Sequence, residues 1–186
     1  QLGWVYGNEN YRTTDGGDTW TALPFLGSTY FMQFYTPAFG LTTGNFGQYI
    51  SLDSGSTWVE SPNGMFTFDF INNTTGLGAS ADAIFRTTDG GSTFTSVFSG
   101  NISDVRNLSS NVAVGIADST FVRSTDGGVS WTTGENAENR TLLFRAADNT
   151  VLAYGRSGFY PEYDDRVFRS ADGGISWTDL GEVIPN

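Results

Sequence analysis

The chain of 186 residues contains no cysteine, no histidine and no lysine. The absence of cysteine excludes disulfides and thiolate chemistry. The absence of histidine excludes Ser-His-Asp and Cys-His catalysis and disfavours zinc. No apolar run approaches the roughly 18 residues of a membrane span, so no membrane insertion is expected. No signal peptide is recognisable, and a chain that begins at Gln1 is expected of a processed or trimmed protein.

Positive charge is scarce as well. Nine arginines stand against twenty acidic residues, which gives a net charge of −11. Nucleic acids and anionic membranes bind basic surfaces, so neither is expected as a partner. Glycine is abundant, with 24 residues, and aromatic residues make up 15% of the chain. This composition favours short strands and tight turns.

Five segments share the pattern [Ser/Thr]-x-Asp-x-Gly-x-[Ser/Thr]-[Trp/Phe], and each is called a box below. The steps between the box aspartates are 38, 36, 37 and 46 residues. A near-constant step indicates a repeat architecture. In chain order, the boxes carry Asp15, Gly17 and Trp20; Asp53, Gly55 and Trp58; Asp89, Gly91 and Phe94; Asp126, Gly128 and Trp131; and Asp172, Gly174 and Trp177.

Each box position has a physical role in a hairpin turn. The aspartate can accept hydrogen bonds from backbone N–H groups of the turn that follows it. The glycine two residues later allows a positive φ. The hydroxyl residues hold the turn from both sides, and the aromatic residue can fill the gap between neighbouring units. The five aspartates are therefore expected to serve folding and not catalysis.

Apolar runs between the boxes predict four short antiparallel strands per unit, with the box joining the third strand to the fourth. The run that starts at Met65 alternates, which predicts Phe66, Phe68 and Phe70 on one face. A four-stranded unit of roughly 40 residues has the size of a propeller blade. The expected blades of this single domain are 1–27, 28–63, 64–100, 101–138 and 139–186.

The boxes resemble the Asp-box (BNR) repeat, which is known from sialidases, sortilin-type ectodomains, glucanase propellers and photosystem II assembly factors. The stretches Gly3–Asn8 and Tyr11–Gly17 look most like the photosystem II assembly factor type. The resemblance implies an all-β propeller of five blades, with the box acids at the periphery. Members of the photosystem type have seven blades and a basic arginine patch, and both features are missing here. The Arg-Ile-Pro motif of sialidases is also absent.

The first blade begins at its second strand, near Gly3, so closure of the ring is an open question. In one alternative, the five blades form a complete ring, with Glu182–Pro185 as a weak seam strand. In the other, a longer chain or an assembly supplies the missing strand.

The last step is the longest, because extra residues lie between the second and third strands of the fifth blade, at Gly155–Arg166. In a propeller, this loop lies on the face opposite the boxes, and insertions in repeat proteins tend to map to the binding face. A solvated loop is the simpler alternative, and the acids could also hold Ca²⁺. The candidate binding residues are Arg156, Phe159, Tyr160, Glu162, Tyr163, Asp164 and Asp165.

These observations favour a non-enzymatic scaffold that binds another protein, a copy of itself or a glycan. No cofactor, metal or catalytic residue is expected. The expected setting is extracellular or within a virion, with an assembly-factor role as a further context. The alternative is a sialidase-like glycoside hydrolase, for which only Glu162, Asp164 and Asp165 offer a carboxylate pair. Arg106, Arg140, Arg145, Arg156 and Arg166 lie outside the boxes and their flanks and are expected to be free for binding.

Overall fold

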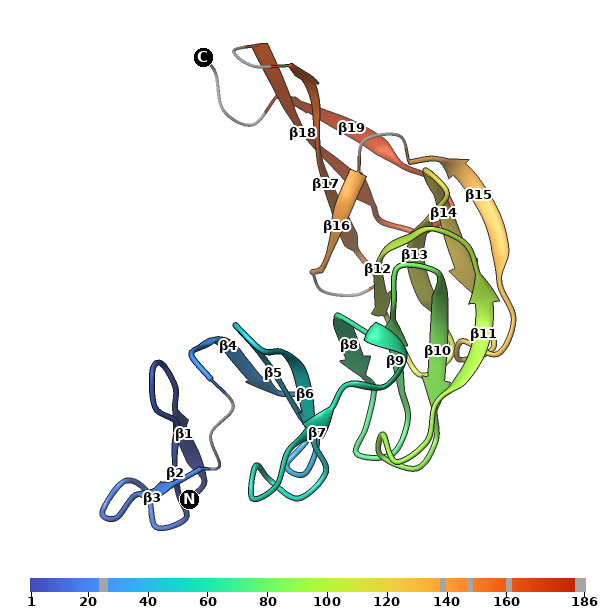
Figure 1. Cartoon of the computed structure of the whole chain (residues 1–186). Helices are drawn as coiled ribbons and strands as arrows, with labels where there is room; N and C mark the ends of the chain where they lie inside the picture. Colours follow the sequence, from blue (N-terminus) through green and yellow to red (C-terminus); the bar gives the residue numbers. More distant parts are fainter. Residues whose placement is uncertain (24–26, 138–139, 147–148, 160–161, 183–186) are drawn as a thin grey trace.

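The computed structural model describes residues 1–23, 27–137, 140–146, 149–159 and 162–182. It contains five antiparallel sheets, each formed by strands consecutive in the sequence; the first sheet has three strands and the others have four. These sheets are the blades 1 to 5, and each lies within one of the five expected segments (Figure 1). The all-β expectation is confirmed for these residues, because the one helical segment is the short 3₁₀ turn Pro62–Gly64.

The strands are short in most blades and long in the last one. Blade 1 contains β1 (Gly3–Val5), β2 (Tyr11–Thr13) and β3 (Thr21–Ala22); blade 2 contains β4 (Thr29–Phe34), β5 (Gly40–Gly44), β6 (Gly47–Ser51) and β7 (Val59–Glu60). Blade 3 contains β8 (Thr67–Phe70), β9 (Gly76–Ala79), β10 (Ala83–Thr87) and β11 (Thr95–Ser99); blade 4 contains β12 (Ile102–Asn107), β13 (Ala113–Ala117), β14 (Thr120–Ser124) and β15 (Thr132–Asn136). Blade 5 contains β16 (Arg140–Arg145), β17 (Val151–Phe159), β18 (Glu162–Ser170) and β19 (Thr178–Glu182).

The described residues form an open arc. Figure 1 shows blade 1 at one end and blade 5 at the other, with the remaining blades between them in sequence order. The closed five-blade ring is therefore not the arrangement of this chain. Among the described residues, blade 1 has no innermost strand, as the sequence indicates. Of the expected seam Glu182–Pro185, Glu182 belongs to β19, where it pairs with Arg166, and residues 183–185 lie outside the described residues.

The apolar core is divided into clusters that lie between neighbouring blades. In the first cluster, Phe39 of blade 2 packs against Phe68 of blade 3, with the ring centroids 5.0 Å apart. A second cluster joins blades 3 and 4, and a third joins blades 4 and 5. Blade 1 is attached to blade 2 by Trp4, which stacks on Phe34 at 3.7 Å. Burial of each large side chain contributes roughly 1.5–3 kcal/mol, so stacking of the blades supplies most of the stability.

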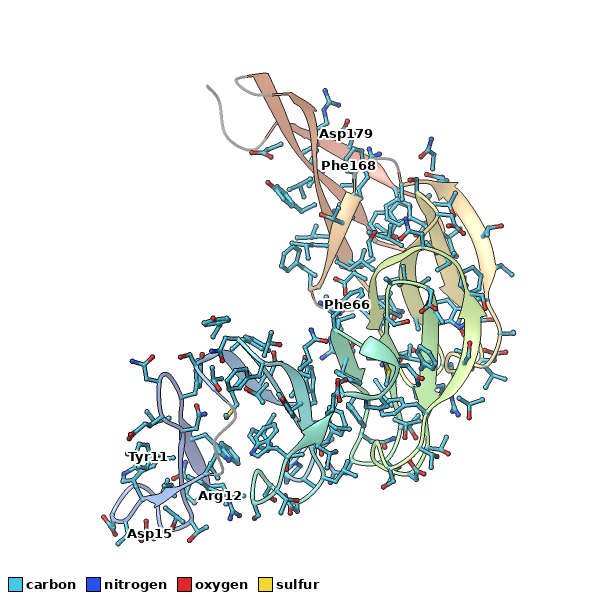
Figure 2. The ribbon with its side chains drawn as sticks, viewed as in Figure 1. Tyr11, Arg12, Asp15, Phe66, Phe168 and Asp179 are labelled. Atoms are coloured by element: carbon cyan, nitrogen blue, oxygen red, sulfur yellow. The ribbon has the colours of Figure 1, made fainter. Side chains whose placement is uncertain are left out.

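The predicted alternation of the Met65 run fails at one position. Met65 is fully buried, whereas Phe66, which is labelled in Figure 2, is 36% exposed. Phe66 N donates to the Ala79 carbonyl, and Thr67 is also paired with Ala79. Two residues therefore oppose one, which is a β-bulge, and the extra residue shifts Phe66 off the face of Phe68. The innermost strands of blades 2, 4 and 5 carry the same irregularity near their starts.

In blades 2 to 5, the box turn packs against the preceding blade at the glycine two residues after its aspartate, as at Gly128. A Cβ on Gly128 would lie 2.6 Å from Leu77 Cδ2, and its φ is +85°. We expect Gly128→Ala to lower the free energy of unfolding by about 1–3 kcal/mol, because it adds both a clash and backbone strain. Denaturant unfolding measures this change. Gly7→Ala is the matched control, since a Cβ there meets open space; equal effects of the two variants would contradict the expectation.

Candidate functional site

The box carboxylates are occupied by their own turns. Asp126 Oδ1 accepts the Ser130 N–H at 2.9 Å and the Ser124 hydroxyl at 2.8 Å, and Asp126 Oδ2 accepts the Ser130 hydroxyl at 2.5 Å. Ser124 Oγ in turn accepts the Gly128 N–H at 2.8 Å. The same set of bonds is present around Asp53, with Ser51, Gly55 and Thr57 as partners.

These hydrogen bonds keep the box acids ionised. The Thr93 hydroxyl, together with the Thr93 N–H, lowers the pKa of Asp89 to about 2. Hydroxyl donors likewise lower the pKa of Asp15, Asp126 and Asp172. An acid that is ionised at neutral pH cannot donate a proton in catalysis. Each blade carries one box between its last two strands, so the carboxylates do not share a cleft.

Two of the arginines that precede the boxes link consecutive blades. Arg86 Nε donates to the Gly127 carbonyl at 2.8 Å, and Arg123 Nε donates to the Gly173 carbonyl at 2.6 Å. Each acceptor is the residue just after the box aspartate of the following blade. The sequence places these arginines within the repeat but gives no sign of this contact between blades.

Four of the five arginines that the sequence leaves for binding are engaged within the chain, which corrects that expectation. Arg106 pairs with Asp104 at 2.6 Å, and the Arg140 guanidinium lies 3.5 Å from the centroid of the Phe168 ring. Arg145 Nη1 donates to the Asn107 carbonyl, and Arg166 pairs with Asp179. Most of these arginines therefore make contacts within the fold.

The predicted loop of blade 5 is a β-hairpin. The strands β17 and β18 stay paired from Val151↔Ser170 to Phe159↔Glu162, so the extra residues extend two strands that already exist. This is a correction to the expected loop, and its physical reason is that an insertion with equal additions on both sides keeps the strand register. Figure 1 shows the extended strands reaching beyond the rest of blade 5.

The hairpin brings the candidate binding residues together along two paired strands. Arg156 pairs with Asp165, Gly158 pairs with Tyr163, and Phe159 pairs with Glu162. Asp165 is the candidate whose side chain is described: it is 9% exposed and accepts the Tyr154 hydroxyl at 2.7 Å. Asp164 pairs with Ser157 in the backbone ladder, and Tyr160 lies outside the described residues.

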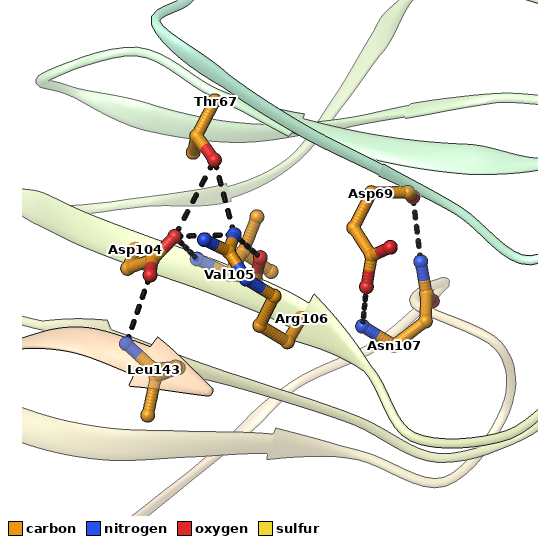
Figure 3. A network of polar contacts seen from close by, with 7 residues as sticks. All are labelled: Thr67, Asp69, Asp104, Val105, Arg106, Asn107 and Leu143. Atoms are coloured by element: carbon orange, nitrogen blue, oxygen red, sulfur yellow. Dashed lines mark hydrogen bonds and ion pairs between the residues drawn. The ribbon is translucent and has the colours of Figure 1, made fainter. Parts of the chain in front are cut away.

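A polar network on the innermost strands was not predicted from the sequence (Figure 3). Asp104 of β12 is 2% exposed, and its two carboxylate oxygens have different partners. Asp104 Oδ1 accepts from Arg106 Nη1 at 2.6 Å and from Val105 N at 2.9 Å, whereas Oδ2 accepts from Leu143 N of blade 5 at 2.9 Å. Arg106 Nη1 also donates to Thr67 Oγ1 of blade 3 at 3.0 Å. One carboxylate thus ties three blades together.

A second carboxylate, that of Asp69 on β8, joins blades 3 and 4. Asp69 Oδ2 accepts the Asn107 N–H at 2.6 Å, and Asn107 Nδ2 donates to the Asp69 carbonyl at 2.7 Å. Burial raises the pKa of both Asp69 and Asp104, although their donors oppose the shift. The available sequence signal was an acid within an apolar strand, as in Phe68-Asp69-Phe70. Such an acid must be paired, because an unpaired buried charge is costly.

No protein-family model matches this sequence, and no curated protein matches it. Solved structures do resemble the fold. An ancestral GH74 enzyme superposes with a TM-score of 0.65 and 14% identity over 96% of this chain, which spans 29% of that structure. YCF48 from Cyanidioschyzon merolae superposes with a TM-score of 0.51 and 17% identity, covering 96% of this chain and 80% of the other. The chain has a β-propeller fold. At these identities the likeness shows the fold alone.

Among the described residues, no group of three or more His, Cys, Asp or Glu side chains is placed to hold a metal ion. Within the same ranges, no helix has the length and apolar character required for a membrane crossing. Two features of the described residues depart from the repeated box pattern: the inner polar network and the long hairpin of blade 5.

Removal of the Asp104 carboxylate is expected to loosen three blades at once. Asp104→Ala leaves the Leu143 N–H and the Arg106 guanidinium without their acceptor, so we expect a loss of about 3 kcal/mol in the free energy of unfolding. Asp104→Asn keeps an acceptor of the same shape and should cost less. Denaturant unfolding of both variants tests this ranking, and an Asn variant as damaged as the Ala variant would show that the bond to Leu143 is unimportant.

The box aspartates should make stability depend on pH in the acid range. The folded pKa of Asp89, about 2, lies below the usual value of 3.8, so the folded state binds fewer protons than the unfolded state. This stabilisation is complete above the unfolded pKa and is lost as the pH falls through the window from 3.8 to about 2. We expect the denaturant midpoint to fall across that window and to fall less in Asp89→Ala.

The control for this measurement is Asp18→Ala. Asp18 is exposed and makes no hydrogen bond in the described part of the chain. Its removal should leave the acid dependence of the wild type in place. An Asp89→Ala variant that loses stability as steeply as the wild type would refute the role assigned to the box carboxylates.

Proposed function

We propose that this propeller is a non-enzymatic binding module that recognises a partner protein through the β17–β18 hairpin. The observation that carries the proposal is the extension of these two strands to nine residues each, beyond the length of any other strand described. The hairpin tip lies at the end of blade 5 opposite its box turn, since the two connections leave β18 at opposite ends. The chemistry of the boxes is therefore separate from this tip.

In the described part of blade 5, the outer strands end before the extended part of the hairpin. The strand β16 pairs with β17 only as far as Gly155, and β19 pairs with β18 from Arg166 onward. In the described ladder, residues 156–159 and 162–165 therefore pair with each other and have no register partner on β16 or β19. Unpaired strand edges present backbone N–H and C=O groups that can pair with an extended peptide. This supports recognition of a protein segment by strand addition.

The composition of the tip supports the same partner class. Phe159, Tyr160 and Tyr163 lie near acids in the sequence, and the whole chain carries a net charge of −11. Aromatic residues are enriched at protein interfaces, and an acidic chain favours a basic partner over an acidic one. Glycans also bind to aromatic side chains, so a sugar ligand is the main alternative outcome of the test.

The described carboxylates support binding over hydrolysis. Box acids such as Asp126 accept hydrogen bonds from their own turns, and the half-buried Asp69 and the buried Asp104 hold neighbouring blades together. A glycoside hydrolase needs two carboxylates facing one bond of the substrate. The biological context is a further part of the proposal: the likeness to YCF48 favours an assembly-factor role, and an exported or virion setting fits the acidic, cysteine-free composition.

A shortened hairpin tests the proposal. In this variant residues 157–164 are replaced by Asn-Gly, which forms a two-residue turn between Arg156 and Asp165 and keeps the Tyr154–Asp165 hydrogen bond. We expect the wild-type propeller to capture extended peptides from a display library, and the shortened variant to lose that binding at least about tenfold while unfolding at the same denaturant concentration.

Three arms separate the alternatives. The same two proteins are applied to the peptide library, to a glycan array and to chromogenic glycosides. Hairpin-dependent peptide binding supports the proposal. Hairpin-dependent glycan binding would identify the partner as a glycan and not a protein. Turnover of a glycoside would overturn the non-enzymatic assignment. Peptide binding that is unchanged in the shortened variant would show that the binding site lies on another surface.

A further inference from the structure

The last blade of the arc leaves an apolar sheet face uncovered. A shallow depression of about 340 Å³ on this face is lined by Leu142, Phe144, Leu152, Ala153, Tyr154 and Val167. Phe144 is 52% exposed and Leu142 is 44% exposed. In blades 2, 3 and 4, the corresponding faces are covered by the following blade.

The interior blades show what covers such a face. On blade 4, Arg123 of β14 is the cross-strand partner of Val114 on β13. Arg123 Nε donates to the Gly173 carbonyl in the box of blade 5, and Gly174 packs so closely on Val114 that a Cβ would clash. On blade 3, the pair of Arg86 and Leu77 receives the box of blade 4 in the same way, through Gly127 and Gly128.

Blade 5 carries the same receiving pair. Arg169 of β18 is the cross-strand partner of Leu152 on β17. Arg169 is exposed, and no hydrogen bond from it occurs among the described residues. Its position is that of Arg86 and Arg123, three residues before the box aspartate. The end face of blade 5 is therefore shaped for the box turn of another blade.

At the opposite end of the arc, the box of blade 1 is exposed. The box aromatic residues of blades 3, 4 and 5 pack on the blade before them, as in Trp177, which stacks on Phe121 at 3.8 Å. Trp20 of blade 1 is instead 44% exposed and lines a depression of about 330 Å³ with Val5 and Tyr11. A Cβ on Gly17 would touch only Trp20 of its own box.

We infer that these two faces bind each other between copies of the chain, so that the box of blade 1 in one copy docks on the end face of blade 5 in another. Three contacts seen between blades 4 and 5 have counterparts: Arg169 with the Gly16 carbonyl, Leu152 with Gly17, and Val167, which occupies the position of Phe121, with Trp20. Figure 1 places the two faces at opposite ends of the arc, so one copy does not satisfy both.

A contact of this kind is head-to-tail. The two surfaces differ, so each copy uses one face to bind and offers the other to a further copy. The assembly closes into a ring or grows into a filament, depending on the rotation between copies. It uses the sheet faces at the ends of the arc and does not depend on the hairpin function proposed above.

Two exposed substitutions test the arrangement. Phe144→Asp blocks the face of blade 5, and Val5→Asp, at a residue that is 51% exposed, blocks the face of blade 1. The 20.1 kDa chain is examined by sedimentation velocity over a concentration series. We expect the wild type to associate, and each variant alone to bind copies of itself at least about tenfold more weakly. Val129→Asp, at an exposed residue of the blade 4 box, is the control that should associate like the wild type.

An equal mixture of the two variants gives the decisive result. Each variant keeps one intact face, so a head-to-tail contact predicts a dimer in the mixture and nothing larger. A wild type that stays at 20.1 kDa at every soluble concentration overturns the inference and assigns these faces to other partners. It is also overturned if the variants associate like the wild type, or if their mixture stays monomeric although the wild type associates.

Discussion

The fold depends on the insertion of a box turn into the face of the preceding blade. In that position a glycine must occupy the turn, because Leu77 leaves no room for a Cβ on Gly128. The same turn holds its own aspartate, and its carbonyl accepts the arginine of the preceding blade. One short segment therefore closes a hairpin and joins two sheets. This explains why the motif repeats once per blade while the remaining residues of each blade vary.

This arrangement separates folding chemistry from recognition chemistry. The box carboxylates accept hydrogen bonds within their own turns, Arg86 and Arg123 donate to the next blade, and Asp69 and Asp104 of the inner strands accept from neighbouring blades. New contacts therefore arise most readily where strand length is free to change, at the connection between the second and third strands. Blade 5 has lengthened this connection into a hairpin without disturbing its box.

The fold was predictable from the sequence because the box is local. Spacing and residue type identify the turn, and the turn identifies the third and fourth strands around it. The inner network was less predictable, since the partners of Asp104 come from Thr67 and Leu143, far away in the sequence. The bulge that exposes Phe66 was not predictable from alternation, because alternation assumes an unbroken ladder. The open arc depends on how blades are inclined to one another, which no residue pattern encodes directly.

The inner strands change character along the arc, and this change explains why the last face can bind another subunit. The innermost strand of blade 4 carries the ion pair of Asp104 and Arg106, and the Leu143 N–H of blade 5 donates a hydrogen bond to Asp104. The corresponding positions of blade 5 are Leu142 and Phe144, which are apolar and exposed. A carboxylate at these positions would need a donor from any partner that covered it, whereas an apolar face can be covered without one. The hairpin points along the strands and the end face lies across them, so both surfaces can be occupied together.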